Sequence, residues 1–166
     1  QNAYLPCFFK TTDGGATWTG PTMVSLNNMD TILGTPQTGY VWSMLFEFDV
    51  VLDNNDNPHL LGNIYMLDPV AGQYLAGAGA FGVCDIYSND GGTSWFGKFL
   101  STTQTYQGVW DDNAGSTAAD RTRPALSRNA AGDKIFYVYF DTDTIANPGS
   151  ENVLPDAWCI GYDLTS

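Results

Sequence analysis

TTDGGATW at residues 11–18 and SNDGGTSW at residues 88–95 are two copies of one pattern. Each copy has a hydroxyl residue, an Asp two positions later, a Gly two further on and a Trp three beyond that. An Asp carboxylate and a hydroxyl so placed can accept hydrogen bonds from nearby backbone N–H groups, and glycine adopts positive φ without steric cost. The pattern therefore predicts two tight hairpin turns, each with a Trp ring folded over it and buried between neighbouring sheets.

The three cysteines extend this repetition along the chain. Cys7 and Cys84 each lie six residues before the Asp of a turn, 77 positions apart, and Cys159 follows 75 positions later. Residues 49–61 and 124–136 also align at an offset of 75, with a polar turn in the middle of each stretch. The chain is thus an internal repeat of about 75 residues.

One period of the repeat reads as four antiparallel strands. Apolar or β-prone runs at 44–52, 59–67, 81–87 and 96–101 alternate with turn-forming residues, and the next period supplies runs at 123–128, 134–140 and 157–162. Four strands per repeat at this period are typical of a β-propeller blade. We expect an all-β fold, a β-propeller segment of four-stranded antiparallel blades that comprises about two to three blades.

This interpretation divides the single segment 1–166 into the end of a blade at 1–25, a full blade at 42–101 and an incomplete blade at 121–166. A closed propeller usually has at least about four blades. We therefore expect the chain to be a fragment or an oligomeric subunit, whose partners are the remaining blades of the same protein or other protein chains. The first residue, Gln1, reads as mature sequence with no signal peptide before it.

The composition excludes several function classes. Hydrophobic residues make up 43% of the chain and aromatic residues 14%, which indicates a folded protein. The net charge of −12 leaves no basic face for a phosphate backbone, so we expect no nucleic-acid partner. No apolar run approaches about 18 residues, so we expect no membrane span.

The two turn patterns resemble Asp-boxes, also called BNR repeats, which occur in sialidases and many other extracellular β-propellers. In that family the box lies between the third and fourth strands of a blade, on the face away from the active-site channel, and its role is mainly structural. The resemblance assigns a structural role to eight residues: Thr11, Asp13, Gly15, Trp18, Ser88, Asp90, Gly92 and Trp95.

A second resemblance covers the end of the chain. The stretches at 132–143 and 154–163 are similar to repeats of large bacterial surface proteins that use type IX secretion. This resemblance implies an extracellular or cell-surface location in a bacterium.

A sialidase-like activity is the sharpest enzymatic hypothesis. The family resemblance implies three arginines from different blades around the substrate carboxylate, a Tyr activated by a Glu, and an Asp acid/base. Here Arg121, Arg123 and Arg128 lie in one short stretch and could not surround a ligand by themselves. Arg121 and Arg123 precede an innermost strand, so they are possible ligand-binding residues for an anion or glycan; the alternative is that they pair with Asp111, Asp112 or Asp120 and hold a loop.

Other polar groups have plainer interpretations. The residues 141–143 and 53–56 carry closely spaced oxygen ligands for a possible Ca²⁺, but neither matches the calcium-loop spacing, and turns explain them equally. We predict no metal-binding residues and no cofactor beyond that possible Ca²⁺. His59 stands alone and is expected to be a hydrogen-bonded structural residue.

The cysteines and the aromatic residues in or beside the long loops are the last candidate functional residues. Three cysteines at equivalent positions cannot all pair, so we expect small buried residues on the third strands. Tyr40, Trp42, Tyr106 and Trp110 could stack on sugar rings or cap the edges of the sheets.

Together these observations predict a non-enzymatic structural or binding module of a secreted or cell-surface bacterial protein, with no catalytic residues in this chain. The alternative is part of a sialidase-like glycoside hydrolase or of a glycan-binding propeller.

Overall fold

Strands account for nearly all the regular structure of the protein. The computed structural model describes residues 5–26, 29–75, 81–102, 109–111, 116–118, 123–141 and 156–165. Every pair of neighbouring strands is antiparallel, so the all-β prediction is confirmed. The strands are β1 (Cys7–Lys10), β2 (Thr19–Met23), β3 (Val41–Leu52), β4 (Pro58–Asp68), β5 (Gln73–Tyr74), β6 (Phe81–Tyr87), β7 (Phe96–Ser101), β8 (Val109–Asp111), β9 (Ser116–Ala118), β10 (Ala125–Arg128), β11 (Lys134–Asp141) and β12 (Asp156–Asp163).

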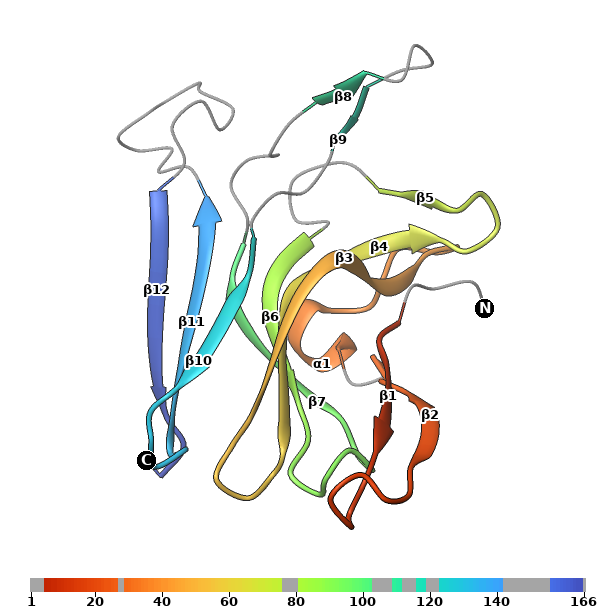
Figure 1. Ribbon diagram of the computed structural model, residues 1–166. Helices are drawn as coiled ribbons and strands as arrows, with labels where there is room; N and C mark the ends of the chain where they lie inside the picture. The colour runs from red at the N-terminus through yellow and green to blue at the C-terminus, as the bar shows by residue number, and fades with distance from the viewer. Residues whose placement is uncertain are drawn as a thin grey trace.

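The central sheet is a four-stranded antiparallel meander in the order β3-β4-β6-β7, with the short β5 added beside β4 (Figure 1). Its strand β4 is buried along almost its whole length, although antiparallel strands commonly expose one face to water. Leu60 and Ile64 pack on one side of the sheet, and Leu61 packs on the other. The apolar sequence of β4 therefore follows from burial of both faces.

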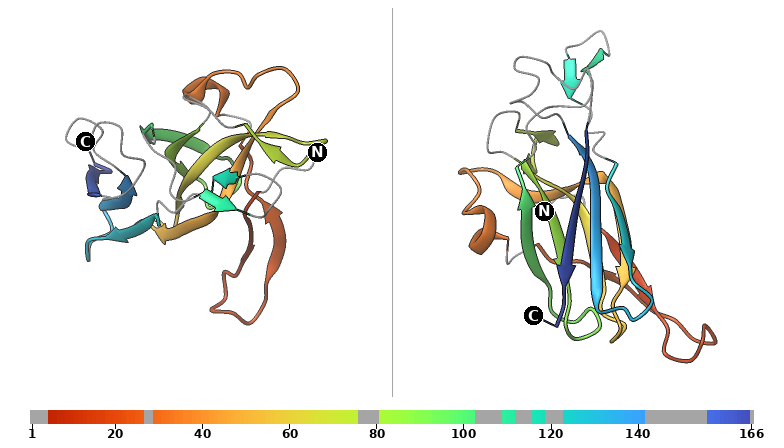
Figure 2. Two further views of the ribbon diagram at one scale, coloured as in Figure 1. Left: turned by 90° about the horizontal axis from the view of Figure 1, so that it is seen from above. Right: turned by 90° about the vertical axis from the view of Figure 1, so that its left-hand side faces the viewer.

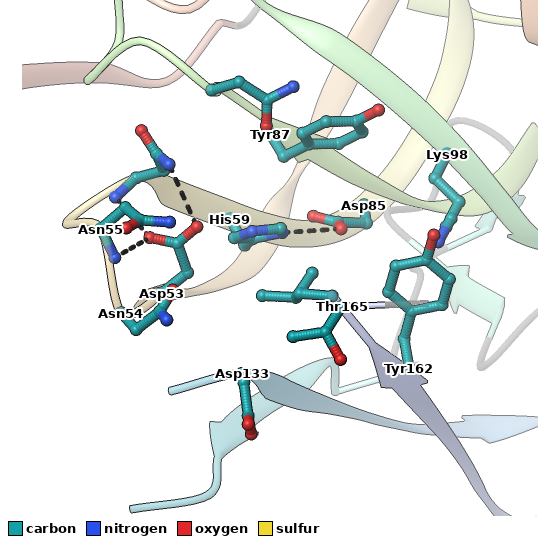
Figure 3. A pocket seen from close by; sticks show the side chains of 13 residues that line it. Asp53, Asn54, Asn55, His59, Asp85, Tyr87, Lys98, Asp133, Tyr162 and Thr165 are labelled. Carbon is teal, nitrogen blue, oxygen red and sulfur yellow. Dashed lines mark hydrogen bonds and ion pairs between the residues drawn. The ribbon is translucent and has the colours of Figure 1, made fainter. Parts of the chain in front are cut away.

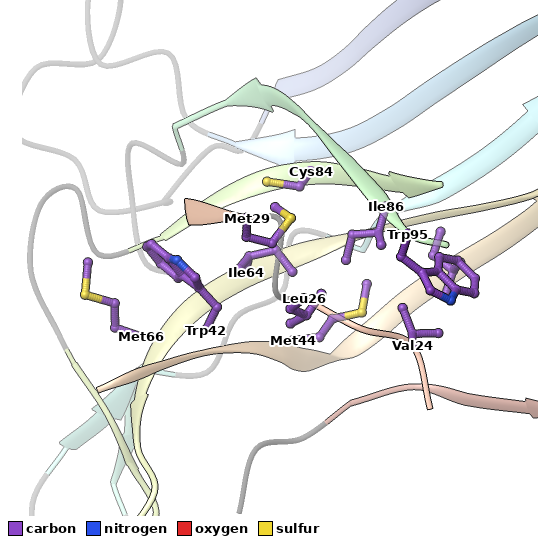
Figure 4. Packing of buried hydrophobic residues seen from close by; sticks show 11 residues of the cluster. Val24, Leu26, Met29, Trp42, Met44, Ile64, Met66, Cys84, Ile86 and Trp95 are labelled. Carbon is purple, nitrogen blue, oxygen red and sulfur yellow. The ribbon is translucent and has the colours of Figure 1, made fainter. Parts of the chain in front are cut away.

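A smaller sheet lies on each side of the central one, so that these three of the four described sheets form a row (Figures 1 and 2). One neighbour is the hairpin β1-β2, and the other is the meander β10-β11-β12. The side facing the hairpin holds the larger core, where Trp42, Met44 and Ile86 of the central sheet meet Val24 and Leu26 (Figure 4). The one-turn helix α1 (Asp30–Leu33) closes this core through Ile32 and Leu33.

The second core lies between the central sheet and the last one. It consists of Leu61 and Val83 from the central sheet and Ile135, Tyr137 and Tyr139 from β11. Both cores hold side chains from sheets that lie far apart in sequence, so the order of the sheets depends on contacts between repeats.

The first strands of two successive repeats lie side by side. Strand β10 contacts β3, and the backbone N–H of Leu126 donates to Asp49 Oδ2 at 2.7 Å. At the far end of these strands, the Asn54 N–H donates to the Gly132 carbonyl at 3.1 Å, which joins the two equivalent turns. The described residues form an open row of sheets, and a closed ring is not seen among them.

The strand predictions from the sequence match this structure closely. The runs at 81–87 and 96–101 coincide with β6 and β7. Helix α1, strand β5 and the separate hairpin β8-β9 were not predicted. Within the described part of the chain, no helix has the length and apolarity needed to cross a membrane.

Candidate functional site

The first Asp-box-like turn is held by its own side chains. Thr11 Oγ1 accepts from the Gly15 N–H at 2.8 Å and donates to Asp13 Oδ1 at 2.9 Å. The Asp13 carboxylate also accepts from the backbone N–H of Thr17 at 2.9 Å and from its hydroxyl at 2.6 Å. The hydroxyl and the carboxylate thus bind two backbone donors from the second half of the turn, Gly15 and Thr17.

The second turn repeats this network one repeat later. Ser88 Oγ accepts from the Gly92 N–H at 2.7 Å and donates to Asp90 Oδ1 at 2.8 Å, and Asp90 Oδ1 accepts from the N–H groups of Thr93 and Ser94. Gly15 and Gly92 have φ of 94° and 93°, values that favour glycine. The backbones of the two copies therefore have the same conformation at this position.

The hydrogen bonds stabilise both carboxylates in the ionised form. The pKa of Asp13 is lowered to about 2, chiefly by the Thr17 hydroxyl, and the pKa of Asp90 is lowered to about 2, chiefly by the Ser94 N–H. Both carboxylates use their acceptors within the turn, an arrangement that suits a structural role.

The two tryptophans of the turns differ in their surroundings. Trp95 is buried, and the Phe8 ring packs edge-on against it with centroids 5.6 Å apart. Trp18 is 60% exposed and donates from Nε1 to the Gly15 carbonyl at 3.1 Å. The prediction that both rings are buried is therefore wrong for Trp18, because no sheet covers that side of the first hairpin among the described residues.

The two arginines proposed as ligand contacts are not brought to a pocket by the described structure. Arg121 lies outside the described residues. Arg123 is exposed just before β10, at a φ of 44°, and its backbone N–H donates to Glu47 Oε2 at 3.1 Å. The third, Arg128, donates from its guanidinium to the Asp53 carbonyl at 2.9 Å.

The structure describes all of the possible calcium-binding stretch 53–56 but only one residue of the stretch 141–143. Asp53 accepts from the N–H groups of Asn55 and Asn57 and from the Asn57 amide, so it closes the β3–β4 turn. Of the stretch 141–143, only the buried Asp141 lies within the described residues. Over the described ranges, no group of three or more His, Cys, Asp or Glu side chains is placed to hold a metal ion.

The cysteine prediction holds at one position only. Cys84 is fully buried, and burial raises the pKa of its thiol far above the usual range. Cys7 and Cys159 are exposed, so the prediction of burial is wrong for them: β1 and β12 belong to the outer sheets, whereas β6 lies between two sheets. All three thiols are free.

The loop aromatics that are described lie in the core. Trp42 is buried and donates from Nε1 to the Gly34 carbonyl at 3.2 Å, and the partly buried Tyr40 packs against the same core. Tyr106 lies outside the described residues, as does the side chain of Trp110.

A polar pocket of about 440 Å³ opens between the central sheet and the last sheet (Figure 3). It lies at the end of the sheets that carries the β3–β4 turn and the second Asp-box-like turn. Residues from both sheets and from these turns line it: Asp53, Asn54, Asn55, Asn57, His59, Asp85, Tyr87, Asn89, Lys98, Asp133, Tyr162, Leu164 and Thr165. Within this lining, the sequence indicated only the stretch 53–56 as a possible ligand position, for Ca²⁺, and it predicted no site that joins Asp85 to the last sheet.

A buried carboxylate forms the inner wall of this pocket. Asp85 is 1% exposed, and its Oδ2 lies 2.9 Å from His59 Nδ1 and 2.7 Å from the Tyr137 hydroxyl. Because an ionised carboxylate only accepts, His59 carries its proton on Nδ1 and Tyr137 donates. Burial raises the pKa of Tyr137 far above its usual value, with a further contribution from the negative Asp85, so its hydroxyl keeps its proton.

His59 positions this carboxylate. The imidazole stacks on the Tyr87 ring with centroids 5.5 Å apart, and in the described part of the chain no hydroxyl or thiol is hydrogen-bonded to it. The predicted hydrogen-bonded His59 is thus confirmed. The arrangement is a fixed acceptor beside a cavity, which suits binding.

A signal for Asp85 lies in the sequence, although no site was predicted from it. The residues that follow the three cysteines are Phe8, Asp85 and Ile160. Phe8 and Ile160 pack against the two apolar cores, whereas the central repeat has a carboxylate at this position. A charged residue in an otherwise apolar buried strand is a strong indication of a polar partner.

No protein-family model, curated protein or solved structure matches the chain.

Proposed function

We propose that this chain is a segment of an Asp-box β-propeller and serves as a non-enzymatic structural or binding module of a secreted or cell-surface bacterial protein. In this proposal the three sheets correspond to the end of one blade, a full blade and an incomplete blade. The Asp-box residues have a structural role, and remaining blades of the same protein or other protein chains are the partners.

The observation that carries the proposal is the contact between equivalent first strands. In a propeller the innermost strands of successive blades lie side by side around the axis. The contact between β3 and β10, joined by the hydrogen bond from Leu126 to Asp49, supports such an arrangement. Further support comes from the face-to-face packing of the four-stranded meander against both neighbours. An experimental structure tests this directly: β10 hydrogen-bonded into the edge of the central sheet would overturn the propeller.

The non-enzymatic part of the proposal has its own test. Purified protein is incubated with a fluorogenic sialoside and with fluorogenic neutral glycosides, and released fluorophore is measured. We expect no turnover, since the three arginines lie in one stretch and Arg123 does not line the pocket. Turnover that is lost in an Arg123→Ala variant would favour the sialidase-like alternative.

The location is proposed from the acidic composition and from the resemblance to surface-protein repeats. An antibody against the chain should label unpermeabilised cells of the producing organism or detect the protein in the culture medium. Signal only after permeabilisation would contradict the location and leave the architecture untouched.

A further inference from the structure

We infer that the pocket between the central and last sheets binds an organic ammonium group, with Asp85 as its main acceptor. The inference rests on the proposed binding role and names the chemistry of its ligand. A free amine and a lysine side chain of another protein share this chemistry, and titration with a probe of each kind separates them.

The inner wall of the pocket holds an unsatisfied acceptor. Asp85 Oδ2 accepts from both His59 and Tyr137, whereas the buried Oδ1 has no hydrogen-bond partner among the described residues. A buried polar atom without a partner carries a free-energy penalty, and for a charged group the penalty is large. A donor from a bound molecule would remove it.

The charge of the pocket wall is negative. Three carboxylates line the pocket, those of Asp53, Asp85 and Asp133, against the single ammonium of Lys98. These carboxylates outnumber the ammonium group in the pocket wall, and the whole chain has a net charge of −12. Coulomb attraction therefore favours a cationic ligand over a neutral polyol, and strongly disfavours an anion such as a sialic acid.

Two aromatic rings add to the attraction for a cation. Tyr87 of β6 and Tyr162 of β12 line the pocket from the two facing sheets (Figure 3). Lys98 Nζ lies over the Tyr162 ring, so the face of this ring already contacts one ammonium group. Carboxylate and aromatic faces together form the kind of site that ammonium groups prefer.

The structure predicts opposite effects for two single substitutions. Asp85→Asn keeps the shape of the side chain and removes its charge, so affinity for an amine should fall about tenfold or more. Lys98→Met keeps most of the length of the side chain and removes the like charge, so affinity should rise. If these two side chains only stabilised the fold, the two substitutions would not change amine affinity in opposite directions.

One aspartate and one lysine outside the pocket provide matched controls for these two substitutions. Asp141 is buried on β11, and Asp141→Asn should leave amine affinity unchanged. Lys134 pairs with Asp163 outside the pocket, and Lys134→Met should likewise leave it unchanged. Circular dichroism and thermal melting show whether each variant is folded.

The experiment measures binding by titration calorimetry and by amide chemical shifts. The probes are 1,4-diaminobutane, its neutral analogue 1,4-butanediol, and Nα-acetyl-lysine methylamide as the side-chain source. We expect saturable binding of one or both amines that weakens as salt rises from about 0.02 to about 0.3 M, with shifts at Asp85 and Tyr162. Binding of both amines indicates a shared ammonium site, and preference for one identifies the source.

Three results would overturn the inference. These are equal affinity for the diol, no saturable binding of either amine by folded protein, and unchanged affinity in the folded Asp85→Asn variant. If that variant does not fold, weaker amine binding by Lys98→Met would overturn the inference in its place. Chemical conversion of a bound amine would instead contradict the non-enzymatic role and leave the ammonium site standing.

Discussion

At the scale of single residues, Asp13 and Asp90 show how a short pattern sets both a conformation and an ionisation state. Each carboxylate receives several donors from its own turn, and all of them favour the negative form. The backbone conformation and the low pKa are therefore two results of one hydrogen-bond network.

The hydrogen bonds to Asp13 and Asp90 make the free energy of unfolding depend on pH in acid. Both groups have a folded pKa of about 2 against an ordinary value of 3.8. A lowered folded pKa adds stability that is complete above pH about 4 and is lost as the pH falls towards 2. Carboxyl-carbon NMR titration should give values near 2 for both residues, and Asp90→Asn should flatten the fall in unfolding free energy over this range.

A result of ordinary values near 4 for both carboxyls would contradict the hydrogen-bond networks of both turns. An unchanged slope in the Asp90→Asn variant would assign the acid sensitivity to other groups.

At the scale of elements, the two hairpins have the same turn but different neighbours. The first hairpin packs against the second turn. Lys10 Nζ donates to the Gly91 carbonyl at 3.1 Å, and the Phe8 ring covers Gly92. No described hairpin covers the first turn in the same way. Two copies of one turn pattern thus differ in burial because their neighbours differ.

Two matched glycine substitutions measure this difference. Gly15 and Gly92 have nearly equal positive φ, so alanine at either should cost about 1 kcal/mol from backbone strain. A Cβ at Gly92 would lie 2.7 Å from Phe8 Cζ, whereas one at Gly15 would meet nothing closer than 3.7 Å. Urea unfolding should therefore show Gly92→Ala less stable than Gly15→Ala by about 1–3 kcal/mol. Equal losses would mean that the Phe8 ring does not pack on the second turn.

The strands and turns could be predicted because their signals are local. The runs at 81–87 and 96–101 are bounded by turn formers, and the Asp-Gly-Gly pattern contains its own hydrogen-bond partners. The pocket could not be predicted in this way, because Asp85 meets Tyr137 across 52 positions and only packing of two sheets brings them together. The exposure of Trp18 likewise depends on which sheet lies beside it.

At the scale of the whole molecule, one buried hydrogen bond ties the central sheet to the last one. The Tyr137 hydroxyl of β11 donates to Asp85 of β6 between them. Removing one partner of a buried charged hydrogen bond costs more than the bond itself, because the carboxylate is left short of a donor.

Tyr137→Phe should therefore lower the unfolding free energy by about 1–3 kcal/mol. Tyr139 is a suitable comparison, since it is also buried on β11 and its hydroxyl makes no hydrogen bond to a described residue. Tyr139→Phe should cost less than about 0.5 kcal/mol. Denaturant titration of both variants checks this, and equal effects would mean that the hydroxyl of Tyr137 does not reach Asp85.

The contacts between equivalent turns determine how unfolding of one sheet affects the next. Lys10 reaches the turn of the next repeat, and Asn54 reaches Gly132 of the one after it. Coupling therefore passes between nearest neighbours, as in a linear array of repeats. Within the described residues, unfolding of the central sheet would remove the contacts that each outer sheet makes with it, whereas an outer sheet could unfold while the central sheet persists. We therefore expect the central sheet to set the cooperativity of unfolding.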